Sequence, residues 1–381
     1  MKSIAIFGST GTIGQNALEV VAQHVDRYCV EALVAQNNVD LIIRQALQFE
    51  PKYVALENEK HYNKLKSALS HLKNTEILVG KQAINDLAGI KFDFFLSAIV
   101  GLAGLEPTFK AIEAGSDIGM ANKESLVAAG TLMLDAARKS GAQILPIDSE
   151  HNAIFQIFER ENLAAINKVT LTASGGPFLH FSAEQMRGIN KEQALKHPNW
   201  HMGPKISVDS ATMMNKALEV IEAFHLFPIS KEQIDIVIHP ESIIHGLVEY
   251  ADGSSLAMLS QPDMQTPIAA ALAYPERIKI KYQPLNLAEI GRFNFMAPDE
   301  QKFPALQILR EVLRSEEVQP CSAACIFNAA NEVAVEQFLQ GKIAFNQIIN
   351  MVKKALDEVE TTPIGSIEDV MLVSERVKLI L

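Results

Sequence analysis

Short apolar runs alternate with amphipathic stretches through the first 150 residues of the chain. The runs have the length of buried strands, and the stretches between them repeat apolar residues at helical spacing, for example at 15–23 and 40–49. This alternation predicts a parallel sheet wrapped by helices, and therefore an α/β domain over residues 1–150. The strands are expected at 3–7, 30–35, 53–56, 76–79, 93–98, 117–120 and 143–147.

The pattern changes after residue 151, where strands and helices no longer alternate regularly. Two alternating runs flank Asp252-Gly253, a turn dipeptide that predicts a β-hairpin. We therefore expect a central α+β domain over residues 151–274. Its expected elements are a strand at 168–173, a polar loop with Gly and Pro at 174–204, a helix at 210–224 and hairpin strands at 243–250 and 255–259.

Residues 275–304 contain several prolines and little periodicity, which indicates a linker. Residues 305–381 follow a helical pattern almost throughout and predict a C-terminal helical bundle domain. Its helices are expected at 305–314, 322–340, 346–358 and 367–380.

Length and composition exclude several classes of protein. A chain of 381 residues exceeds the usual size of one hydrophobic core, which agrees with several domains. The formal net charge of −11 repels phosphate backbones, so we expect no nucleic-acid partner. No uncharged apolar run approaches the roughly 20 residues that span a bilayer, and three scattered cysteines make no disulfide framework. The first residues have the pattern of a strand, so we expect no signal peptide. We expect a cytoplasmic protein without membrane contact.

A glycine-rich turn joins the first expected strand to the first expected helix. Gly8, Gly11 and Gly14 follow the spacing GxxGxxG, which lets the backbone approach a pyrophosphate at a helix N-terminus; a purely structural turn is the alternative. The second strand is followed by Gln36-Asn37-Asn38, a segment without the acid that binds the ribose of NAD and without a base for the 2′-phosphate of NADP. We therefore expect a real but softened preference for NADPH.

Two carboxylates follow the last strand of the first domain. Asp148 and Glu150 are two residues apart, so an extended chain directs both to the same side, where they repel each other unless they share a proton or a cation. Open α/β sheets bind ligands at this edge. The alternative is that Asp148 or Ser149 caps a helix that starts near Asn152.

A third acidic residue lies in the helix expected at 210–224. Asn215, Lys216 and Glu219 share one face of this helix because three or four positions separate them. Ser210, Asn215 and Lys216 offer a hydroxyl, an amide and an ammonium group that suit a phosphate. Three carboxylates without a nearby cysteine select a hard cation, Mg²⁺ or Mn²⁺. An exposed, ion-paired helix is the alternative.

The only tryptophan, Trp200, lies in the polar loop at 174–204, which also contains Ser174 and His197. A large ring in such a loop indicates a flap, at about 186–204, that closes over a ligand. A tryptophan packed in the core and an ordinary loop histidine are the alternatives.

Seven motifs follow one another along the chain, within a match that extends to about residue 275: GSTGTIG, ANKESL, PIDSEHNAIFQ, LTASGGPF, HPNWHMG, KISVDSATMMNK and IHPESIIHG. In these motifs the sequence resembles the 1-deoxy-D-xylulose 5-phosphate reductoisomerase family. The resemblance implies a homodimer with a Rossmann-like NADPH domain, a catalytic domain and a C-terminal helical domain. It also implies metal-dependent conversion of the sugar phosphate 1-deoxy-D-xylulose 5-phosphate into 2-C-methyl-D-erythritol 4-phosphate, an early step of non-mevalonate isoprenoid synthesis.

The resemblance also implies a role for each residue of the site. The metal ligands would be Asp148, Glu150 and Glu219. The phosphate end of the substrate would contact Ser174, Ser210, Asn215 and Lys216. The hydroxyl and carbonyl region would contact Lys123, Ser149 and His197, with Trp200 on the flap. The cofactor site would comprise Thr10, Gly11, Thr12, Ile13, Asn38, Asn122, Glu124 and Gly203.

Two rival functions fit parts of this pattern. A simple NADP-dependent dehydrogenase of a phosphorylated substrate needs the glycine turn but not three carboxylates, and its activity survives chelation. A regulatory module that binds the nucleotide without turnover leaves Asp148, Glu150, Glu219, Lys123 and Trp200 unexplained.

The family often has Gly-Lys-Asn where this chain has Gln36-Asn37-Asn38, which is the second reason to expect a softened NADPH preference.

Overall fold

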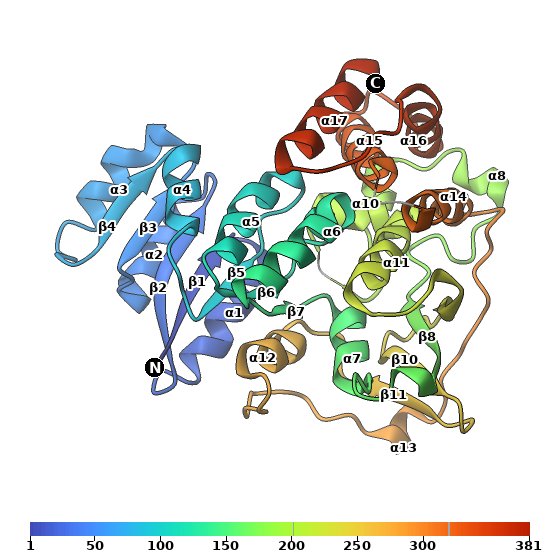
Figure 1. Ribbon diagram of the computed structural model, residues 1–381, viewed down its shortest axis with the longest axis horizontal. Helices are drawn as coiled ribbons and strands as arrows, with labels where there is room; N and C mark the ends of the chain where they lie inside the picture. Colours follow the sequence, from blue (N-terminus) through green and yellow to red (C-terminus); the bar gives the residue numbers. More distant parts are fainter. Residues whose placement is uncertain (201, 319–320) are drawn as a thin grey trace. The chain divides into compact units, whose positions relative to one another are not determined.

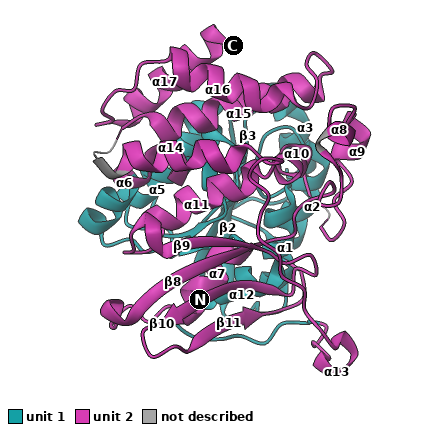
Figure 2. Ribbon diagram, turned by 90° about the vertical axis from the view of Figure 1, so that its right-hand side faces the viewer, with its two compact units in different colours: residues 1–125, 133–148, 264–282 teal, residues 126–132, 149–263, 283–381 magenta. Residues whose placement is uncertain are grey.

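The computed structural model describes residues 1–200, 202–318 and 321–381, and the chain forms two compact units (Figure 2). The helix α12 (Gln265–Ala273) packs against α1 (Thr12–Ala22) and belongs to the first unit, although the chain up to Asp263 and from Gln283 onward belongs to the second. The domain limits expected from the sequence stay a prediction. Unit 1 comprises Met1–Ser125, Met133–Asp148 and Met264–Tyr282, and unit 2 comprises Leu126–Leu132, Ser149–Asp263 and Gln283–Leu381.

Unit 1 contains a seven-stranded parallel sheet with the strand order β4-β3-β2-β1-β5-β6-β7 (Figure 1). The seven predicted strands are confirmed. In β1, the side chains from Ile4 to Phe7 are all buried, as expected where helices cover both faces of a parallel sheet. The strands are β1 (Lys2–Phe7), β2 (Tyr28–Ala35), β3 (Tyr53–Leu56), β4 (Glu76–Val79), β5 (Phe94–Ser97), β6 (Asp117–Met120) and β7 (Ile144–Pro146).

The strand order reverses direction at β1, whose two neighbours are β2 and β5. Such a switch point is where open α/β sheets bind ligands, at the carboxyl ends of the strands. The helices that connect the strands are α1, α2 (Val39–Phe49), α3 (Tyr62–Ala68), α4 (Lys81–Ala88), α5 (Leu105–Glu113) and α6 (Lys123–Ser140), which bends at Ala129.

Unit 2 contains a four-stranded mixed sheet with the order β11-β10-β8-β9. The predicted hairpin is confirmed as β10 (Ile244–Tyr250) and β11 (Ser255–Leu259), which pair antiparallel. The sheet also contains β8 (Ile166–Ala173), which was expected, and β9 (Ile234–Ile238), which was not.

The single helix expected at 210–224 is wrong, because the structure has α10 (Pro204–Thr212) and α11 (Met214–Leu226) with a break at Met213. Met213 has a φ of +61°, a left-handed conformation that ends a helix. The Thr212 hydroxyl promotes the break, because it donates to the Val208 carbonyl oxygen and accepts from the Met214 N–H.

The helices after residue 304 confirm the predicted helical C-terminal region, and four shorter helices lie earlier in unit 2. The four long helices are α14 (Ala305–Val318), α15 (Ala323–Leu339), α16 (Gln347–Glu358) and α17 (Ile367–Ile380). The shorter ones are α7 (Ser149–Ile157), α8 (Ala183–Met186), α9 (Lys191–Ala194) and α13 (Leu287–Ile290). Within the described residues, no helix is both long and apolar enough to cross a membrane.

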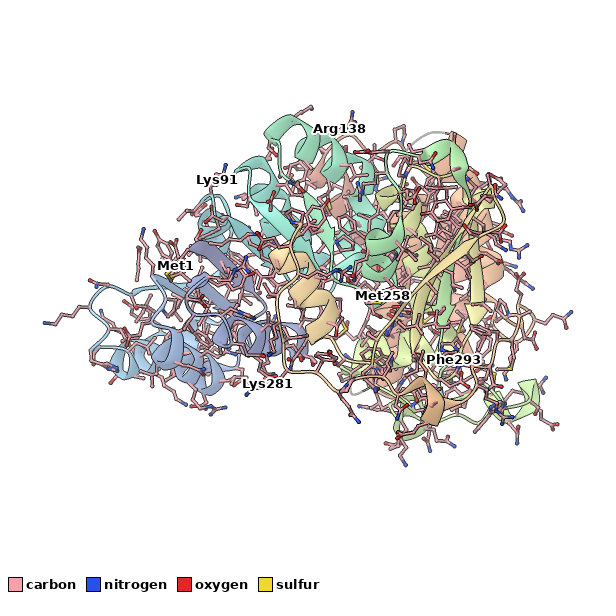
Figure 3. The ribbon with its side chains drawn as sticks, turned by 90° about the horizontal axis from the view of Figure 1, so that it is seen from below. Met1, Lys91, Arg138, Met258, Lys281 and Phe293 are labelled. Atoms are coloured by element: carbon pink, nitrogen blue, oxygen red, sulfur yellow. The ribbon has the colours of Figure 1, made fainter. Side chains whose placement is uncertain are left out.

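The expected linker is held against unit 2 at its second half. Phe293, labelled in Figure 3, packs edge-on against His239 with the ring centroids 5.6 Å apart, and Phe295 stacks on the same ring at 5.0 Å. Met296 forms an isolated β-bridge with Ile238 at the end of β9. The segment is therefore ordered by contacts with the turn that precedes β10.

Candidate active site

The glycine-rich turn lies between β1 and α1, at the carboxyl end of the strand where the sheet order reverses. Gly8 has a φ of +100°, and a Cβ at this position would lie 2.3 Å from the carbonyl oxygen of Ala98, so the turn requires glycine there. Gly11 is the N-cap of α1. The buried Gln45 braces the turn by donating to the Ser9 carbonyl oxygen at 2.8 Å. Free N–H groups at such a helix start suit a pyrophosphate.

Two of the predicted cofactor residues order loops at the same edge of the sheet. The side-chain oxygen of Asn38 caps α2 by accepting from the Leu41 N–H at 3.2 Å. The side-chain oxygen of Asn122 caps α6 by accepting from the Ser125 N–H at 2.7 Å, and its amide nitrogen donates to the Gly101 carbonyl oxygen at 2.8 Å. The other predicted cofactor residues of unit 1 are Thr10, Gly11, Thr12 and Ile13 in the turn, and Glu124 in α6; Gly203, the N-cap of α10, belongs to unit 2.

Lys123 and Asp148 form an ion pair within unit 1. The Lys123 ammonium lies 2.5 Å from an Asp148 carboxylate oxygen, and the two side chains are only 7% and 11% exposed. Lys123 begins α6 after β6, and Asp148 follows β7, so two adjacent strands deliver the pair to one edge of the sheet. The structure thus joins one predicted substrate residue to one predicted metal ligand.

The expectation that Asp148 and Glu150 lie on one extended segment is wrong. β7 ends at Pro146 and α7 begins at Ser149, so Glu150 lies in the first turn of a helix. Asp148 ends unit 1 and Glu150 belongs to unit 2, with Ser149 alone between them in the chain. The Ser149 hydroxyl donates to the Glu150 carboxylate.

Glu150, Lys216 and Glu219 form a cluster in unit 2, in which Lys216 and Glu219 are buried and Glu150 is partly buried. The Lys216 ammonium lies 2.6 Å from a Glu150 carboxylate oxygen and also contacts the Glu219 carboxylate. Asn215 donates from its amide to Glu219. The alternative of an exposed, ion-paired helix is wrong, because Lys216 is 3% exposed and Glu219 is 1% exposed.

The donor set of this cluster suits a hard divalent cation. Carboxylate oxygens of Glu150 and Glu219 lie within 4.8 Å of each other, on two helices, α7 and α11. A buried and a partly buried carboxylate at this separation need positive charge between them, and the Lys216 ammonium supplies it here. Oxygen donors without sulfur select Mg²⁺ or Mn²⁺ over softer metals.

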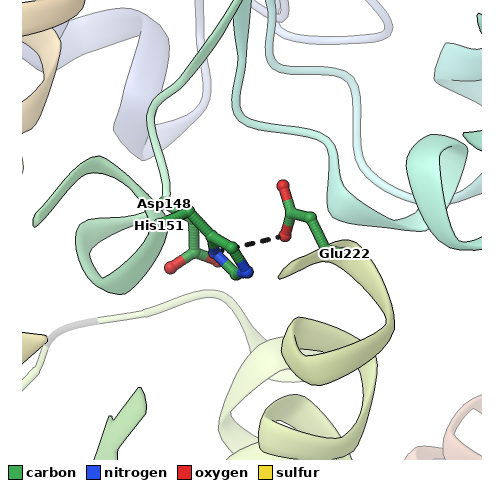
Figure 4. A group of neighbouring side chains, drawn as sticks. All are labelled: Asp148, His151 and Glu222. Carbon is green, nitrogen blue, oxygen red and sulfur yellow. Dashed lines mark ion pairs between the residues drawn. The ribbon is translucent and has the colours of Figure 1, made fainter. Parts of the chain in front are cut away.

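A second buried pair, which the sequence interpretation missed, lies next to this cluster. His151 Nε2 donates to the carbonyl oxygen of Glu219 at 2.7 Å, and its Nδ1 lies 3.5 Å from a Glu222 carboxylate oxygen (Figure 4). Both side chains are fully buried. His151 follows Glu150 directly, and Glu222 is three positions after Glu219, so the helical i,i+3 spacing was the available signal.

Ser174 and His197 contact each other, although 23 positions separate them. The Nδ1 atom of His197 accepts from the backbone N–H groups of Asn199 and Trp200 at 3.2 and 3.0 Å. Its Nε2 therefore carries the proton and donates to the Ser174 hydroxyl at 3.0 Å. Burial lowers the pKa of His197 to about 4, which agrees with a neutral ring.

The segment expected to be a flap contacts the rest of unit 2 at several points. Ile189 and Ala194 are buried in an apolar cluster. The Asn199 amide donates to the Pro240 carbonyl oxygen at 2.6 Å and to the Ser242 hydroxyl at 3.0 Å. Trp200 is partly exposed, with its ring centroid 6.4 Å from that of His245. His201 lies outside the described residues.

Family models match most of the chain. The model of 1-deoxy-D-xylulose 5-phosphate reductoisomerase matches residues 4–130, the model of its C-terminal domain matches residues 144–227, and the DXP reductoisomerase C-terminal domain model matches residues 259–380. The matches therefore extend into the helical region, where the sequence motifs alone give the weakest resemblance.

Curated relatives and solved structures agree with these models. A 1-deoxy-D-xylulose 5-phosphate reductoisomerase of Acinetobacter baumannii is 45% identical over 97% of this chain and 95% of its own. A 1-deoxy-D-xylulose 5-phosphate reductoisomerase of Wolbachia pipientis is 45% identical over 98% of this chain and 95% of its own. The structure of the Zymomonas mobilis enzyme in complex with NADPH is similar with a TM-score of 0.92, 41% identity, and 99% and 97% coverage. The structure of a DOX-P reductoisomerase in complex with NADPH, fosmidomycin and magnesium is similar with a TM-score of 0.93 and 42% identity. The match covers 100% of this chain and 97% of that one.

Proposed function

The chain belongs to the 1-deoxy-D-xylulose 5-phosphate reductoisomerase family, and we propose that it converts this sugar phosphate into 2-C-methyl-D-erythritol 4-phosphate. The reaction combines an isomerisation, which rearranges the carbon skeleton, with a reduction by NADPH, and it requires a divalent cation. It is an oxidoreductase step in the synthesis of isoprenoid precursors.

The observation that carries the proposal is the cluster of Glu150, Lys216 and Glu219. It places one buried and one partly buried carboxylate beside a buried ammonium group, and carboxylate and ammonium are the two kinds of group that a metal-chelating sugar phosphate needs. We propose that Asp148, Glu150 and Glu219 hold Mg²⁺ or Mn²⁺. A bound divalent cation polarises the carbonyl group of a hydroxy-ketone and acidifies the neighbouring hydroxyl group.

The residues around the cluster orient the two ends of the substrate. We propose that Ser174, Ser210, Asn215 and Lys216 bind the phosphate through hydroxyl, amide and ammonium donors. Lys123, Ser149 and His197 contact the hydroxyl and carbonyl region. The rearrangement produces an aldehyde, which is then reduced, and Trp200 would exclude water from the site while this aldehyde is present.

We propose that NADPH binds at the glycine-rich turn of unit 1, and the residues proposed for its site are Thr10, Gly11, Thr12, Ile13, Asn38, Asn122, Glu124 and Gly203. The fit rests on the turn itself: Gly8 lets the backbone pass close to Ala98, and α1 begins where a pyrophosphate would lie. The hydride that reduces the aldehyde comes from NADPH.

We propose that the enzyme is a homodimer that uses the edge strand β11. Leu256, in this strand, is 43% exposed, and an apolar edge strand favours pairing with another chain. Sedimentation equilibrium tests this assignment, and a monomer at micromolar concentration contradicts it. A cytoplasmic location is also proposed: the three cysteines are free thiols, as in reducing compartments.

One assay tests the proposed function. NADPH oxidation is followed at saturating 1-deoxy-D-xylulose 5-phosphate, with Mg²⁺ and then with a chelator. We expect turnover only with the metal, whereas the rival dehydrogenase continues after chelation. We further expect Glu219→Gln to abolish turnover while NADPH affinity, measured by titration, stays nearly unchanged, because the cofactor turn lies on other elements. Full activity of that variant at saturating metal would remove Glu219 from the site.

A further inference from the structure

Asp209 is a buried carboxylate in the last turn of α10, directly before Ser210. The side chain of Asp209 is only 1% exposed. One of its oxygens lies 2.8 Å from the ammonium group of Lys205, one turn earlier in the same helix. The other oxygen accepts from the side-chain amide of Asn331 at 2.8 Å, across 122 positions of sequence. Asn331 lies in α15 and is fully buried.

This hydrogen bond crosses an apolar contact between two helices. Val208 and Ala211 of α10 pack with Ala334 and Val335 of α15 in one apolar cluster, which also includes Phe178, four residues after Ser174. A hydrogen bond to a charged group in such surroundings is stronger than one in water. The helix α15, in the C-terminal helical region, therefore holds α10 by apolar packing and by the hydrogen bond from Asn331 to Asp209.

The end of α10 in turn supports the loop that contains Ser174. Gly176 has a φ of +66°, and a Cβ there would lie 2.6 Å from the Ser210 carbonyl oxygen, so the loop rests directly on the Ser210 backbone. The same carbonyl oxygen accepts from the Met213 N–H at 3.2 Å, at the break before α11. A rotation of the last turn of α10 would move Ser210, the Ser174 loop and the start of α11 together.

We propose that Asn331 is a positioning residue for the phosphate end of the substrate, acting through Asp209. The inference rests on the proposed function, in which Ser174 and Ser210 bind the phosphate. Asn331 lies in α15 and donates to Asp209, the residue directly before Ser210. The C-terminal helical region thus contributes to substrate affinity as well as to folding.

The chain offers a matched control in Asn328, one turn earlier in α15. Asn328 is also fully buried, but its amide donates to Glu332 of the same helix at 3.0 Å. Neither Oδ1 atom, of Asn328 or of Asn331, has a hydrogen-bond partner among the described residues. The two asparagines therefore differ mainly in whether the amide reaches α10.

The test compares Asn331→Leu with Asn328→Leu in the full-length enzyme. We expect Asn331→Leu to raise KM for 1-deoxy-D-xylulose 5-phosphate about 10-fold, as loss of one such bond implies, while KM for NADPH stays unchanged. Asn328→Leu should lower the melting temperature by a similar amount and leave both KM values unchanged. Equal substrate KM values in the two variants would overturn the proposal, whereas an inactive native enzyme would overturn the proposed function itself.

A second variant covers the case in which Asn331→Leu does not fold. Asp209→Leu is close in size but has no acceptor oxygen, so the hydrogen bond from Asn331 and the ion pair with Lys205 are both lost. We expect the same rise in substrate KM, and a phosphonate hydroxamate should bind about 10-fold more weakly. Native inhibitor affinity and native KM in this variant would contradict the positioning role.

Discussion

Lys216 places its ammonium nitrogen 2.6 Å from a carboxylate oxygen of Glu150, although 66 positions separate the two residues. Burial alone would lower the pKa of Lys216, but the carboxylates of Glu150 and Glu219 together raise it, so the side chain stays charged. The cluster therefore holds two negative groups and one positive group in a buried site. It is prepared for both a further cation and an anionic substrate.

The first prediction concerns Lys216→Met. Without the ammonium group, the partly buried carboxylate of Glu150 lies uncompensated beside the buried carboxylate of Glu219, which costs of order 3 kcal/mol of the free energy of unfolding. We expect a lower melting temperature in chelator and a larger gain on adding Mg²⁺ than in the native protein, as measured by calorimetry. Lys168→Met, which removes an exposed ion pair with Asp235, is the control. Equal Mg²⁺ gains in both variants would show that Lys216 does not neutralise these carboxylates.

The second prediction concerns the cofactor. Asn37 is exposed at the end of β2, where neither an acid nor a base follows the strand. We expect the native enzyme to prefer NADPH over NADH, and Asn37→Lys to widen this preference, because one added charge near the 2′-phosphate contributes roughly 1 kcal/mol. The measurement is kcat/KM for each cofactor, and equal use of both by the native enzyme contradicts the assignment.

The third prediction concerns Trp200, the single tryptophan of the chain. The ring is partly exposed, and if it closes over the ligand as proposed, we expect a phosphonate hydroxamate to quench its fluorescence. Trp200→Ala should weaken inhibitor binding and slow turnover with little change in melting temperature. A variant that melts several degrees lower but binds the inhibitor normally would identify Trp200 as a core residue.

The fourth prediction concerns pH. Burial lowers the pKa of His225 to about 4, and the ring packs so closely on Gly130 that a Cβ there would lie 2.5 Å from it. An unfolded histidine titrates near 6.5, so the folded state binds fewer protons, and the free energy of unfolding falls as the pH drops from about 6.5 toward 4. His197 and His245 shift in the same direction.

We expect His225→Gln to make the melting temperature less dependent on pH between 6.5 and 4, while substitution of the exposed His71 leaves the pH dependence as in the native protein. An identical pH profile for the native protein and the His225 variant would show that this ring does not drive the loss of stability.

The sequence predicted the sheet of unit 1 well because buried parallel strands are continuous apolar runs. It missed α12, whose small apolar residues around Ala269 to Ala271 show no amphipathic pattern, and β9, where Asp235 interrupts a short run. It also missed the break at Met213, since this residue adopts a left-handed conformation only because the surrounding contacts favour it.

The site residues were recognisable as motifs, but their partners were not. The pairing of Lys216 with Glu150 depends on how α11 packs beside α7, and the contact between Asn331 and Asp209 depends on how α15 packs on α10. Such distances follow from tertiary packing, which no local pattern encodes. Glu222, the partner of His151, could have been found from local spacing, because it lies three positions after Glu219 on the same helix.

The most direct test of the central claim is the carbon skeleton of the product. The purified enzyme is supplied with ¹³C-labelled 1-deoxy-D-xylulose 5-phosphate, NADPH and Mg²⁺, and the product is examined by NMR. We predict the branched skeleton of 2-C-methyl-D-erythritol 4-phosphate, formed with one NADPH consumed per product. An unbranched deoxypentitol phosphate, formed by simple reduction of the ketone, would contradict the account and establish the dehydrogenase alternative.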